Sequence, residues 1–244
     1  MQNILITGAS SGLGKSLAIG YANKDTNLFL IGRNKENLEK VKKICENKGS
    51  TVVTQAIDVC DKDSMKIFIE SVDFDIIFAN AGVSAGVIDG FRDEVLYKVA
   101  NTNMFGVLNT ITPAISNMIK NKKGRIVLIS SMASFRGLSS APIYSASKAF
   151  VRYYGEALNN NLKKYNINVN IVCPGFIKTP LTDKNKFYMP FLMSADDAVR
   201  KIKIGIEKNK KFIIFPKILY YSIKFLLSLP FGLDDWIFSK LPEK

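Results

Sequence analysis

The sequence predicts an α/β fold, a single doubly wound parallel sheet of about seven strands with helices on both faces. Short apolar segments alternate with longer segments of helical character along the whole chain. Segments such as FDIIFA and RIVLIS are continuously apolar, which is typical of parallel strands that are buried on both faces. Repeated β-α-β units with right-handed crossovers build a sheet of this kind.

The expected strands are short and rich in Ile, Leu, Val and Phe, as buried strands are. In chain order they are 3–7 (NILIT), 27–31 (NLFLI), 51–57 (TVVTQAI), 75–79 (DIIFA), 125–130 (RIVLIS), 168–172 (NVNIV) and 212–215 (FIIF).

The expected helices fill the intervals between these strands. They cover 13–23, 35–47, 62–72, 93–121, 144–165 and 194–209. The last begins with Ser194 and Asp197 at the spacing of a capping box, just ahead of a periodic apolar run.

No Pro/Gly/Ser-rich linker and no internal repeat divides the 244 residues, so we expect one domain. Residues 1–215 hold the sheet, and 216–244 form an apolar C-terminal extension of the same domain. The first apolar run begins too early for a secretory signal. The three cysteines form no CxxC pair, which favours free thiols in a reducing cytoplasm.

The chain contains no histidine, which excludes histidine-dependent catalytic triads and histidine-containing metal sites. We expect no metal. Acid–base chemistry must therefore use Tyr, Lys, Cys or carboxylates.

The net charge of +13 suits an anionic partner, which is nucleic acid, a membrane lipid or a phosphorylated ligand. Composition alone is the other interpretation, and it is favoured because the lysines are spread along the whole chain. Nucleic-acid binding needs a focused basic patch and a binding module, and neither is recognisable, so we expect no nucleic acid.

A glycine-rich turn, ITGASSGLG, follows the first expected strand. Gly8 permits a sharp exit from the strand, Gly12 lets a pyrophosphate approach the backbone, and Gly14 lets the helix pack closely on the strand. The free N–H groups of the helix start then face the phosphates. Glycine spacing alone also fits a plain β-α turn.

The T-G-x-x-x-G-x-G spacing of this turn resembles that of the short-chain dehydrogenase/reductase family. The resemblance continues in order through IDV (57–59), NAG (80–82), NMFG (103–106), ISS (129–131), YSASK (144–148) and PGFIKT (174–179). It covers residues 3 to about 180. It implies a Rossmann-type fold and an enzyme that interconverts a carbonyl and an alcohol by hydride transfer with a nicotinamide dinucleotide.

Tyr144 and Lys148 lie four residues apart, so they project from one face of the expected helix. A phenol has an ordinary pKa of about 10, and a neighbouring ammonium lowers it. This pair can therefore move a proton without histidine. Two such residues at this spacing are usually a solvated helix surface, but the surrounding motifs favour catalysis, and the resemblance adds a contact of Lys148 with the nicotinamide ribose.

Ser131 ends a buried strand, where its hydroxyl would hold the substrate oxygen as charge develops. Ser130 is its rival, and the family spacing to the tyrosine selects Ser131. The resemblance assigns Asn103 to a water chain that reaches the lysine, and Asn101 is the alternative.

The resemblance also assigns residues to the dinucleotide, with the adenosine on the Asp58 and Asn80 side and the nicotinamide on the Pro174 side. They are Gly8, Ser10, Ser11, Gly12, Leu13, Gly14, Arg33, Asn34, Asp58, Val59, Asn80, Ala81, Gly82, Tyr144, Lys148, Pro174, Gly175, Ile177 and Thr179.

NADP(H) is the preferred cofactor on physical grounds. NAD enzymes place an acid after the second strand to bind the ribose 2′-OH. Here Gly32 stands at that point and Arg33 follows, and a guanidinium suits a 2′-phosphate. Ser11 occupies a turn position that is basic in many NADP-preferring relatives, and Lys15 is a weak substitute.

The C-terminal stretch PKILYYSIKFLLSLPFGLDDWIF is apolar but interrupted by Pro216, Lys217, Lys224 and Pro230, so it is a poor transmembrane helix. Three interpretations stay open. The stretch covers the substrate pocket or a subunit interface, or it packs as core, or it rests on a membrane surface as a peripheral contact, aided by Lys208, Lys210 and Lys211.

The substrate pocket is expected to be lined by 83–90, 135–141 and 181–193, and the apolar residues there favour an apolar carbonyl or alcohol. Those in the last segment are Phe187, Tyr188, Met189, Phe191 and Met193. The resemblance implies a homodimer or homotetramer built through 93–121 and 144–165. The alternative function is a nucleotide-sensing or scaffold protein without turnover, which has no need of an intact Asn103, Ser131, Tyr144 and Lys148.

Overall fold

The structure is a computed structural model that describes residues 1–84, 92–183, 188–229 and 232. The strands of these residues form a seven-stranded, fully parallel sheet in the order β3-β2-β1-β4-β5-β6-β7, which confirms the predicted fold class. The strands are β1 (Gln2–Thr7), β2 (Thr26–Gly32), β3 (Thr51–Ala56), β4 (Ile76–Ala79), β5 (Gly124–Ile129), β6 (Ile167–Pro174) and β7 (Phe212–Phe215).

The helices agree closely with the sequence-based expectation, apart from one interruption and one addition. They are α1 (Gly12–Tyr21), α2 (Lys35–Glu46), α3 (Lys62–Ser71), α5 (Asp93–Ala100), α6 (Gly106–Asn121), α7 (Pro142–Leu162), α8 (Ala195–Glu207) and α9 (Lys217–Leu227), with short turns η2 (Met132–Ser134) and η3 (Lys163–Tyr165). A π-helical turn, η1 (Asn101–Phe105), divides the helix expected over 93–121. Helix α9 lies in the C-terminal segment, to which the sequence assigns no element.

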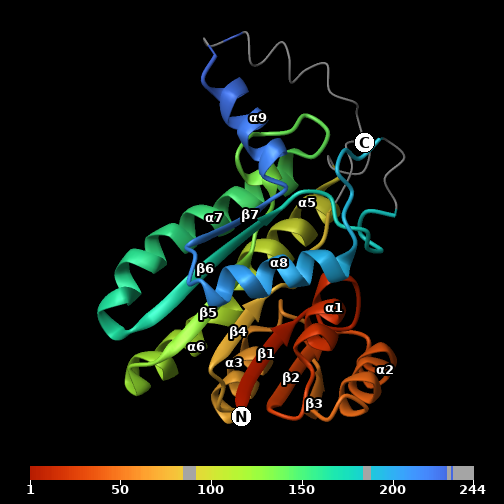
Figure 1. Ribbon diagram of the computed structural model, residues 1–244, viewed down its shortest axis with the longest axis vertical. Coiled ribbons are helices and arrows are strands. Elements are labelled where there is room, and N and C mark those ends of the chain that lie inside the picture. The colour runs from red at the N-terminus through yellow and green to blue at the C-terminus, as the bar shows by residue number, and fades with distance from the viewer. Residues whose placement is uncertain (85–91, 184–187, 230–231, 233–244) are drawn as a thin grey trace.

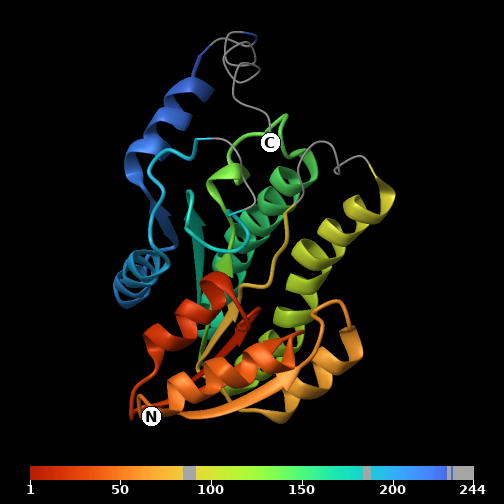
Figure 2. The ribbon, with the colours of Figure 1, turned by 90° about the vertical axis from the view of Figure 1, so that its right-hand side faces the viewer.

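The sheet lies between two helical layers, as Figures 1 and 2 show. Helices α1, α2 and α8 pack on one face, and α3, α6 and α7 pack on the other. Neighbouring strand residues point to opposite layers: Ile4 and Ile6 join the first cluster and Leu5 joins the second. This burial on both faces explains why the strands read as continuously apolar.

The predicted capping of the helix at 194–209 is confirmed, because the Ser194 hydroxyl accepts a hydrogen bond from the Asp197 N–H at 3.1 Å. All three cysteines are free thiols, as expected. Across the described ranges, no helix is both long enough and apolar enough to cross a bilayer. The division of the chain at residue 215 stays a prediction.

The strand order reverses between β1 and β4, so the connections from these two strands leave in opposite directions along the sheet. A crevice forms at such a point, at the carboxyl ends of the strands. The glycine-rich turn follows β1 directly and therefore lies in this crevice.

Candidate functional site

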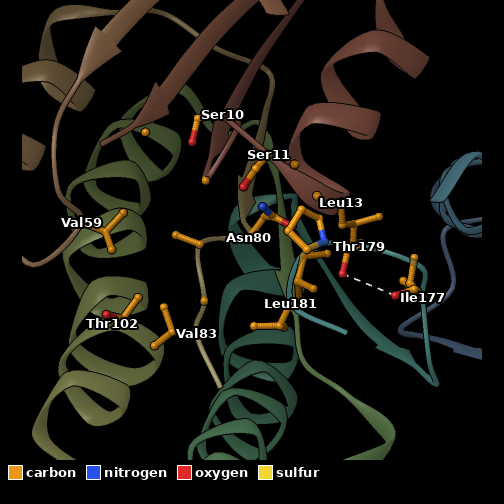
Figure 3. Close-up of a pocket in the computed structure, with 18 of the residues that line it drawn as sticks. Ser10, Ser11, Leu13, Val59, Asn80, Val83, Thr102, Ile177, Thr179 and Leu181 are labelled. Atoms are coloured by element: carbon orange, nitrogen blue, oxygen red, sulfur yellow. Dashed lines mark hydrogen bonds between the residues drawn. The ribbon is translucent and has the colours of Figure 1, made fainter. Parts of the chain in front are cut away.

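A pocket opens at this reversal point, at the carboxyl ends of β1, β4, β5 and β6. Figure 3 shows Val59, Val83 and Thr102 on one side of it and Thr179 and Leu181 on the other. The predicted site residues that line it are Gly8, Ser10, Ser11, Gly12, Leu13, Gly14, Arg33, Asp58, Val59, Asn80, Ala81, Gly82, Ser131, Tyr144, Lys148, Pro174, Gly175, Ile177 and Thr179.

The glycine turn has its shape for local reasons. Gly8 has a φ of +68°, in the left-handed region that glycine adopts without strain. A Cβ on Gly14 would overlap the carbonyl oxygen of Gly8 and approach Asn80 Nδ2 to 2.5 Å. Helix α1 therefore starts directly against the end of β1, and its first N–H groups border the pocket.

Replacing Gly14 with alanine is expected to lower the free energy of unfolding by about 1–3 kcal/mol. Alanine gains about 1 kcal/mol of helix propensity, but its methyl meets backbone that cannot move aside cheaply. Thermal unfolding measures the change, with Gly137→Ala as the control because no atom lies within 4 Å of a Cβ there. Equal melting temperatures for the two variants would contradict this account.

Thr7 and Asn80 join the two strands that flank the crevice. The buried Thr7 hydroxyl donates to the Phe78 carbonyl at 3.1 Å and accepts from the Asn80 N–H at 3.1 Å. The Asn80 amide donates to the Thr7 carbonyl at 2.8 Å. The turn after β1 and the turn after β4 are thus held at a fixed separation.

Lys148 is buried beside Tyr144, one turn further along α7. Its Nζ donates to the Ile129 carbonyl at 3.0 Å and lies 5.8 Å from the centre of the Tyr144 ring. Burial disfavours its charge and lowers the pKa of Lys148 to about 8. The Lys148 amine therefore lies close to the Tyr144 ring.

The Tyr144 pKa differs from the sequence-based expectation. Burial raises the pKa of Tyr144, and a hydrogen bond with Ser131 lowers it. Removal of the phenol from water disfavours the phenolate, and this effect sets the direction of the shift. Tyr144 is accordingly a neutral phenol near pH 7, the form that donates a proton.

The two candidate serines are separated by what their hydroxyls contact. Ser131 Oγ accepts a hydrogen bond from the Ala133 N–H at 3.1 Å, and the Ser131 side chain is also hydrogen-bonded to Tyr144. Ser130 Oγ is buried and donates to the Lys148 carbonyl at 2.8 Å. Ser130 thus fixes α7 to β5, whereas the Ser131 hydroxyl lies with the phenol in the pocket.

Asn103 does not line the pocket, but its hydrogen bonds hold in place residues that lie beside the pocket. It is fully buried in the π turn, where its Oδ1 accepts from the Val83 N–H at 2.8 Å. Its Nδ2 donates to the Val83 carbonyl at 2.9 Å and to Ser147 Oγ at 3.0 Å. Asn101, the alternative, is exposed.

The pocket-lining residues that sequence reasoning did not assign to the site are adjacent in the chain to the motifs. They are Gly32, Ile57, Thr102, Ile129, Ser130 and Pro180. Val83, Leu181 and Thr182 also line the pocket, and they fall within the expected substrate-pocket segments 83–90 and 181–193. Thr182 has a clear structural role, since its hydroxyl donates to the Ile177 carbonyl at 2.6 Å and accepts from the Thr179 N–H at 3.0 Å.

Comparison with known proteins decides the family. The family model described as short chain dehydrogenase matches residues 2–187. The chain is a short-chain dehydrogenase. It is therefore an oxidoreductase that acts on alcohol and carbonyl groups with a nicotinamide dinucleotide.

Its similarity to other proteins extends over almost the whole chain. A protein of Myxococcus xanthus named "Uncharacterized oxidoreductase" is 35% identical over 241 residues, covering 96% of this chain and 95% of that protein. The solved short-chain dehydrogenase from Sphingobium yanoikuyae in complex with NADPH superposes with a TM-score of 0.84 at 24% identity, covering 99% and 97% of the two chains. One from Mycobacterium paratuberculosis bound to NAD gives 0.77 at 23% identity, covering 87% and 94%.

The pocket of this dehydrogenase fits a dinucleotide. Gly14 lets α1 start against the Gly8 carbonyl, and the backbone of the Gly8–Gly14 cradle borders the pocket, where the first N–H groups of a helix can bind phosphate. Gly32 has no side chain beside Ser10, whose Oγ would lie 3.1 Å from an added Cβ. Arg33 Nη1 lies 3.6 Å from Asp58 Oδ2, and both residues line one end of the pocket.

One predicted cofactor residue lies outside the pocket lining. Asn34 caps the start of α2, and its side chain accepts a hydrogen bond from the Asn37 N–H at 2.8 Å. This capping contact accounts for an asparagine at this position without a ligand. Its assignment to the cofactor stays a prediction.

Proposed function

We propose that this dehydrogenase uses NADP(H) in preference to NAD(H) to interconvert a carbonyl and an alcohol on an apolar small molecule. The observation that carries the proposal is the meeting of Ser131, Tyr144 and Lys148 in one pocket with the glycine cradle. A phenol, a serine hydroxyl and a buried amine in contact with a dinucleotide space are suited to proton transfer at a substrate oxygen.

The chain's own residues divide the work of carbonyl reduction. Tyr144, neutral because of its burial, donates its proton to the substrate oxygen as negative charge develops there. The Ser131 hydroxyl, held by the Ala133 N–H, orients that oxygen. Lys148 would contact the ribose of a bound dinucleotide, and Asn103 supports the proton path by holding the Val83 backbone and the Ser147 hydroxyl in place. When bound, the nicotinamide supplies or accepts the electron pair.

The preference for NADP(H) is supported by charge around the adenosine end. Gly32 carries no acid that would repel a 2′-phosphate, and the exposed Arg33 guanidinium borders the same space. A second hollow shares Ser10–Gly12 with the pocket and adds three cations, Lys15, Lys40 and Lys178. Lys15 thus belongs to a group of lysines rather than standing alone.

Replacing Arg33 with alanine is expected to lower kcat/KM for NADPH by about 10- to 100-fold, because a charge-assisted hydrogen bond to the 2′-phosphate is lost. The value for NADH should stay unchanged, since NADH has no such phosphate. Lys66→Ala, which removes an exposed charge from α3, is the control in the same steady-state assay. An equal loss with both coenzymes would assign Arg33 to general adenosine binding.

An apolar substrate is supported by Leu181 and by exposed apolar residues on the segment after it. Of the described residues in the expected lining segments, Val83, Leu181 and Thr182 line the pocket, whereas 135–141 and 188–193 do not. Leu181 lines the pocket and is exposed. Phe191 and Leu192, on the segment that follows, are exposed outside the pocket lining. Phe135, just after η2, packs edge-on against Tyr220 of α9 with 5.2 Å between ring centres. Phe187 and residues 85–90 of the expected pocket lining lie outside the described residues.

A panel of aliphatic, aromatic and steroid-like ketones with NADPH, and of the matching alcohols with NADP⁺, tests the function through the nicotinamide absorbance. Turnover that rises with substrate apolarity is the expected result. Binding of NADPH without turnover of any panel member would favour a nucleotide-sensing protein instead.

Self-association through α5–α6 and α7 belongs to the same proposal. Tyr97 on α5, Phe105 in η1 and Tyr153 on α7 are large aromatic residues that are exposed in the monomer. Light scattering tests for the homodimer or homotetramer. The free thiols suit a cytoplasmic protein.

A further inference from the structure

In the part of the chain that the structure describes, helix α9 packs against the body of the molecule along one side. Tyr220 packs against Phe135, and Leu219 and Pro216 lie against Gly175, where an added Cβ would be 3.5 and 3.0 Å from them. No residue of the helix is fully buried. Figures 1 and 2 show α9 projecting beyond the end of the sheet.

The opposite side of α9 presents an apolar stripe to solvent. Ile218, Tyr221 and Phe225 are 59%, 62% and 66% exposed, and their i, i+3, i+7 spacing places them on one surface of the helix. Exposed aromatic and aliphatic side chains in this arrangement are typical of a surface that meets another apolar phase.

Within α9 and the described chain segments that flank it, the charged side chains are all lysines. Lys217 and Lys224, seven residues apart, are exposed along the edge of the stripe, and the sequence from Lys208 to Leu233 contains no acidic residue. The sequence grouped three further lysines with this segment, Lys208, Lys210 and Lys211. They precede β7 and therefore lie at the amino ends of the strands, at the opposite end of the sheet from α9. The local attraction to an anionic surface therefore comes from the α9 lysines.

We propose that this side of α9, formed by Ile218, Tyr221 and Phe225 with Lys217 and Lys224, docks the protein on an anionic phospholipid bilayer. Lysines beside an inserting apolar stripe are the arrangement of helices that lie in the membrane interface. Tyr221 suits the membrane–water interface because its ring is apolar and its hydroxyl can remain hydrogen-bonded to water.

A second copy of the chain fits this surface less well. A two-fold contact would bring the same patch of both subunits together and so oppose their lysines, on chains that each carry a net charge of +13. Three side chains also cover much less than the roughly 1,000 Å² that a stable interface buries.

Docking through α9 also orients the pocket. Helix α9 follows the carboxyl end of β7, and the pocket opens at the carboxyl ends of the parallel strands. The docked face therefore brings the pocket end of the molecule toward the lipid, from which an apolar substrate enters. This last step rests on the proposed function, whereas the docking surface does not.

Flotation of the full chain with vesicles tests the docking without cofactor or substrate. We expect binding to phosphatidylcholine vesicles that contain phosphatidylglycerol and little binding to pure phosphatidylcholine. Ile218→Ser with Phe225→Ser should weaken binding at least about tenfold. Lys217→Gln with Lys224→Gln should weaken it about fivefold per lysine, and added salt should do the same to the wild type.

Matched controls place the changes elsewhere on the surface. Ile67→Ser removes a 70% exposed isoleucine from α3, and Lys208→Gln with Lys210→Gln removes two lysines from the opposite end of the sheet. Both should bind as the wild type does. Melting temperature and NADPH binding show whether each variant is folded.

The proposal is overturned if the wild type does not float, if it floats equally with both vesicles, or if the α9 and control variants behave alike. A change of oligomeric state in the Ile218→Ser, Phe225→Ser variant without vesicle binding would assign the surface to self-association. Since no turnover is measured, failure here leaves the proposed reaction standing.

Discussion

Tyr144→Phe is expected to lower kcat by about 10²- to 10⁴-fold while the protein stays folded and binds NADPH. The protein should stay folded because the substitution removes only the hydroxyl oxygen of Tyr144 and keeps the aromatic ring and its packing. The proton donor for the substrate oxygen is lost, and the Ser131 hydroxyl keeps its bond from the Ala133 N–H. Steady-state turnover measures the effect, and quenching of protein fluorescence by NADPH measures binding.

The matched control for this loss lies on the same helix. Tyr154→Phe removes the same atom from a partly buried tyrosine that stacks on Phe150 at 5.7 Å and lies outside the pocket. Its turnover should stay near that of the wild type. Turnover by Tyr144→Phe within a few-fold of the wild type would remove the phenol from the mechanism.

Much of this site could be predicted from the sequence because its determinants are local. Gly8 and Gly14 are required by backbone angles and contacts within one turn, and Tyr144 and Lys148 are brought together by helical spacing alone. Parallel strands then bring these separate motifs to one edge of the sheet. The reversal of strand order places the turn after β1 beside the residues after β4.

The properties that escaped prediction depend on tertiary contacts. The direction of the Tyr144 pKa follows from how much of the phenol is desolvated, which the four-residue spacing does not determine. The bracing role of Asn103 depends on Val83 and Ser147, from different segments. Asn34 shows the reverse case, since its motif position suggested a ligand whereas its side chain caps a helix.

Replacing Lys148 with methionine is expected to stabilise the cofactor-free protein at pH 7 while lowering turnover. The buried ammonium has a pKa of about 8, compared with 10.5 for an ordinary lysine. Each pKa unit corresponds to about 1.4 kcal/mol, so charge burial costs about 3 kcal/mol. Loss of the hydrogen bond to the Ile129 carbonyl costs about 1 kcal/mol. The net expected gain is about 2 kcal/mol.

The pH dependence follows from the direction of the Lys148 shift. Its pKa is lower in the folded chain, so between about pH 8 and 10.5 the unfolded chain binds more protons. The free energy of unfolding of the wild type therefore gains a contribution as the pH rises through this window. Below pH 8 both states are protonated and the full cost of the buried charge is present.

Urea unfolding of the cofactor-free proteins at several pH values separates this account from simple repacking. The advantage of Lys148→Met over the wild type should be largest below pH 8 and shrink toward pH 10.5, whereas Lys66→Met on the exposed face of α3 should show no such trend. An advantage that does not vary with pH would trace to packing and not to charge. A less stable variant at pH 7 would mean that the Ile129 contact outweighs desolvation. The expected outcome is a lysine held at this site for what it does to the bound ligand and the phenol, at a cost to the stability of the empty fold.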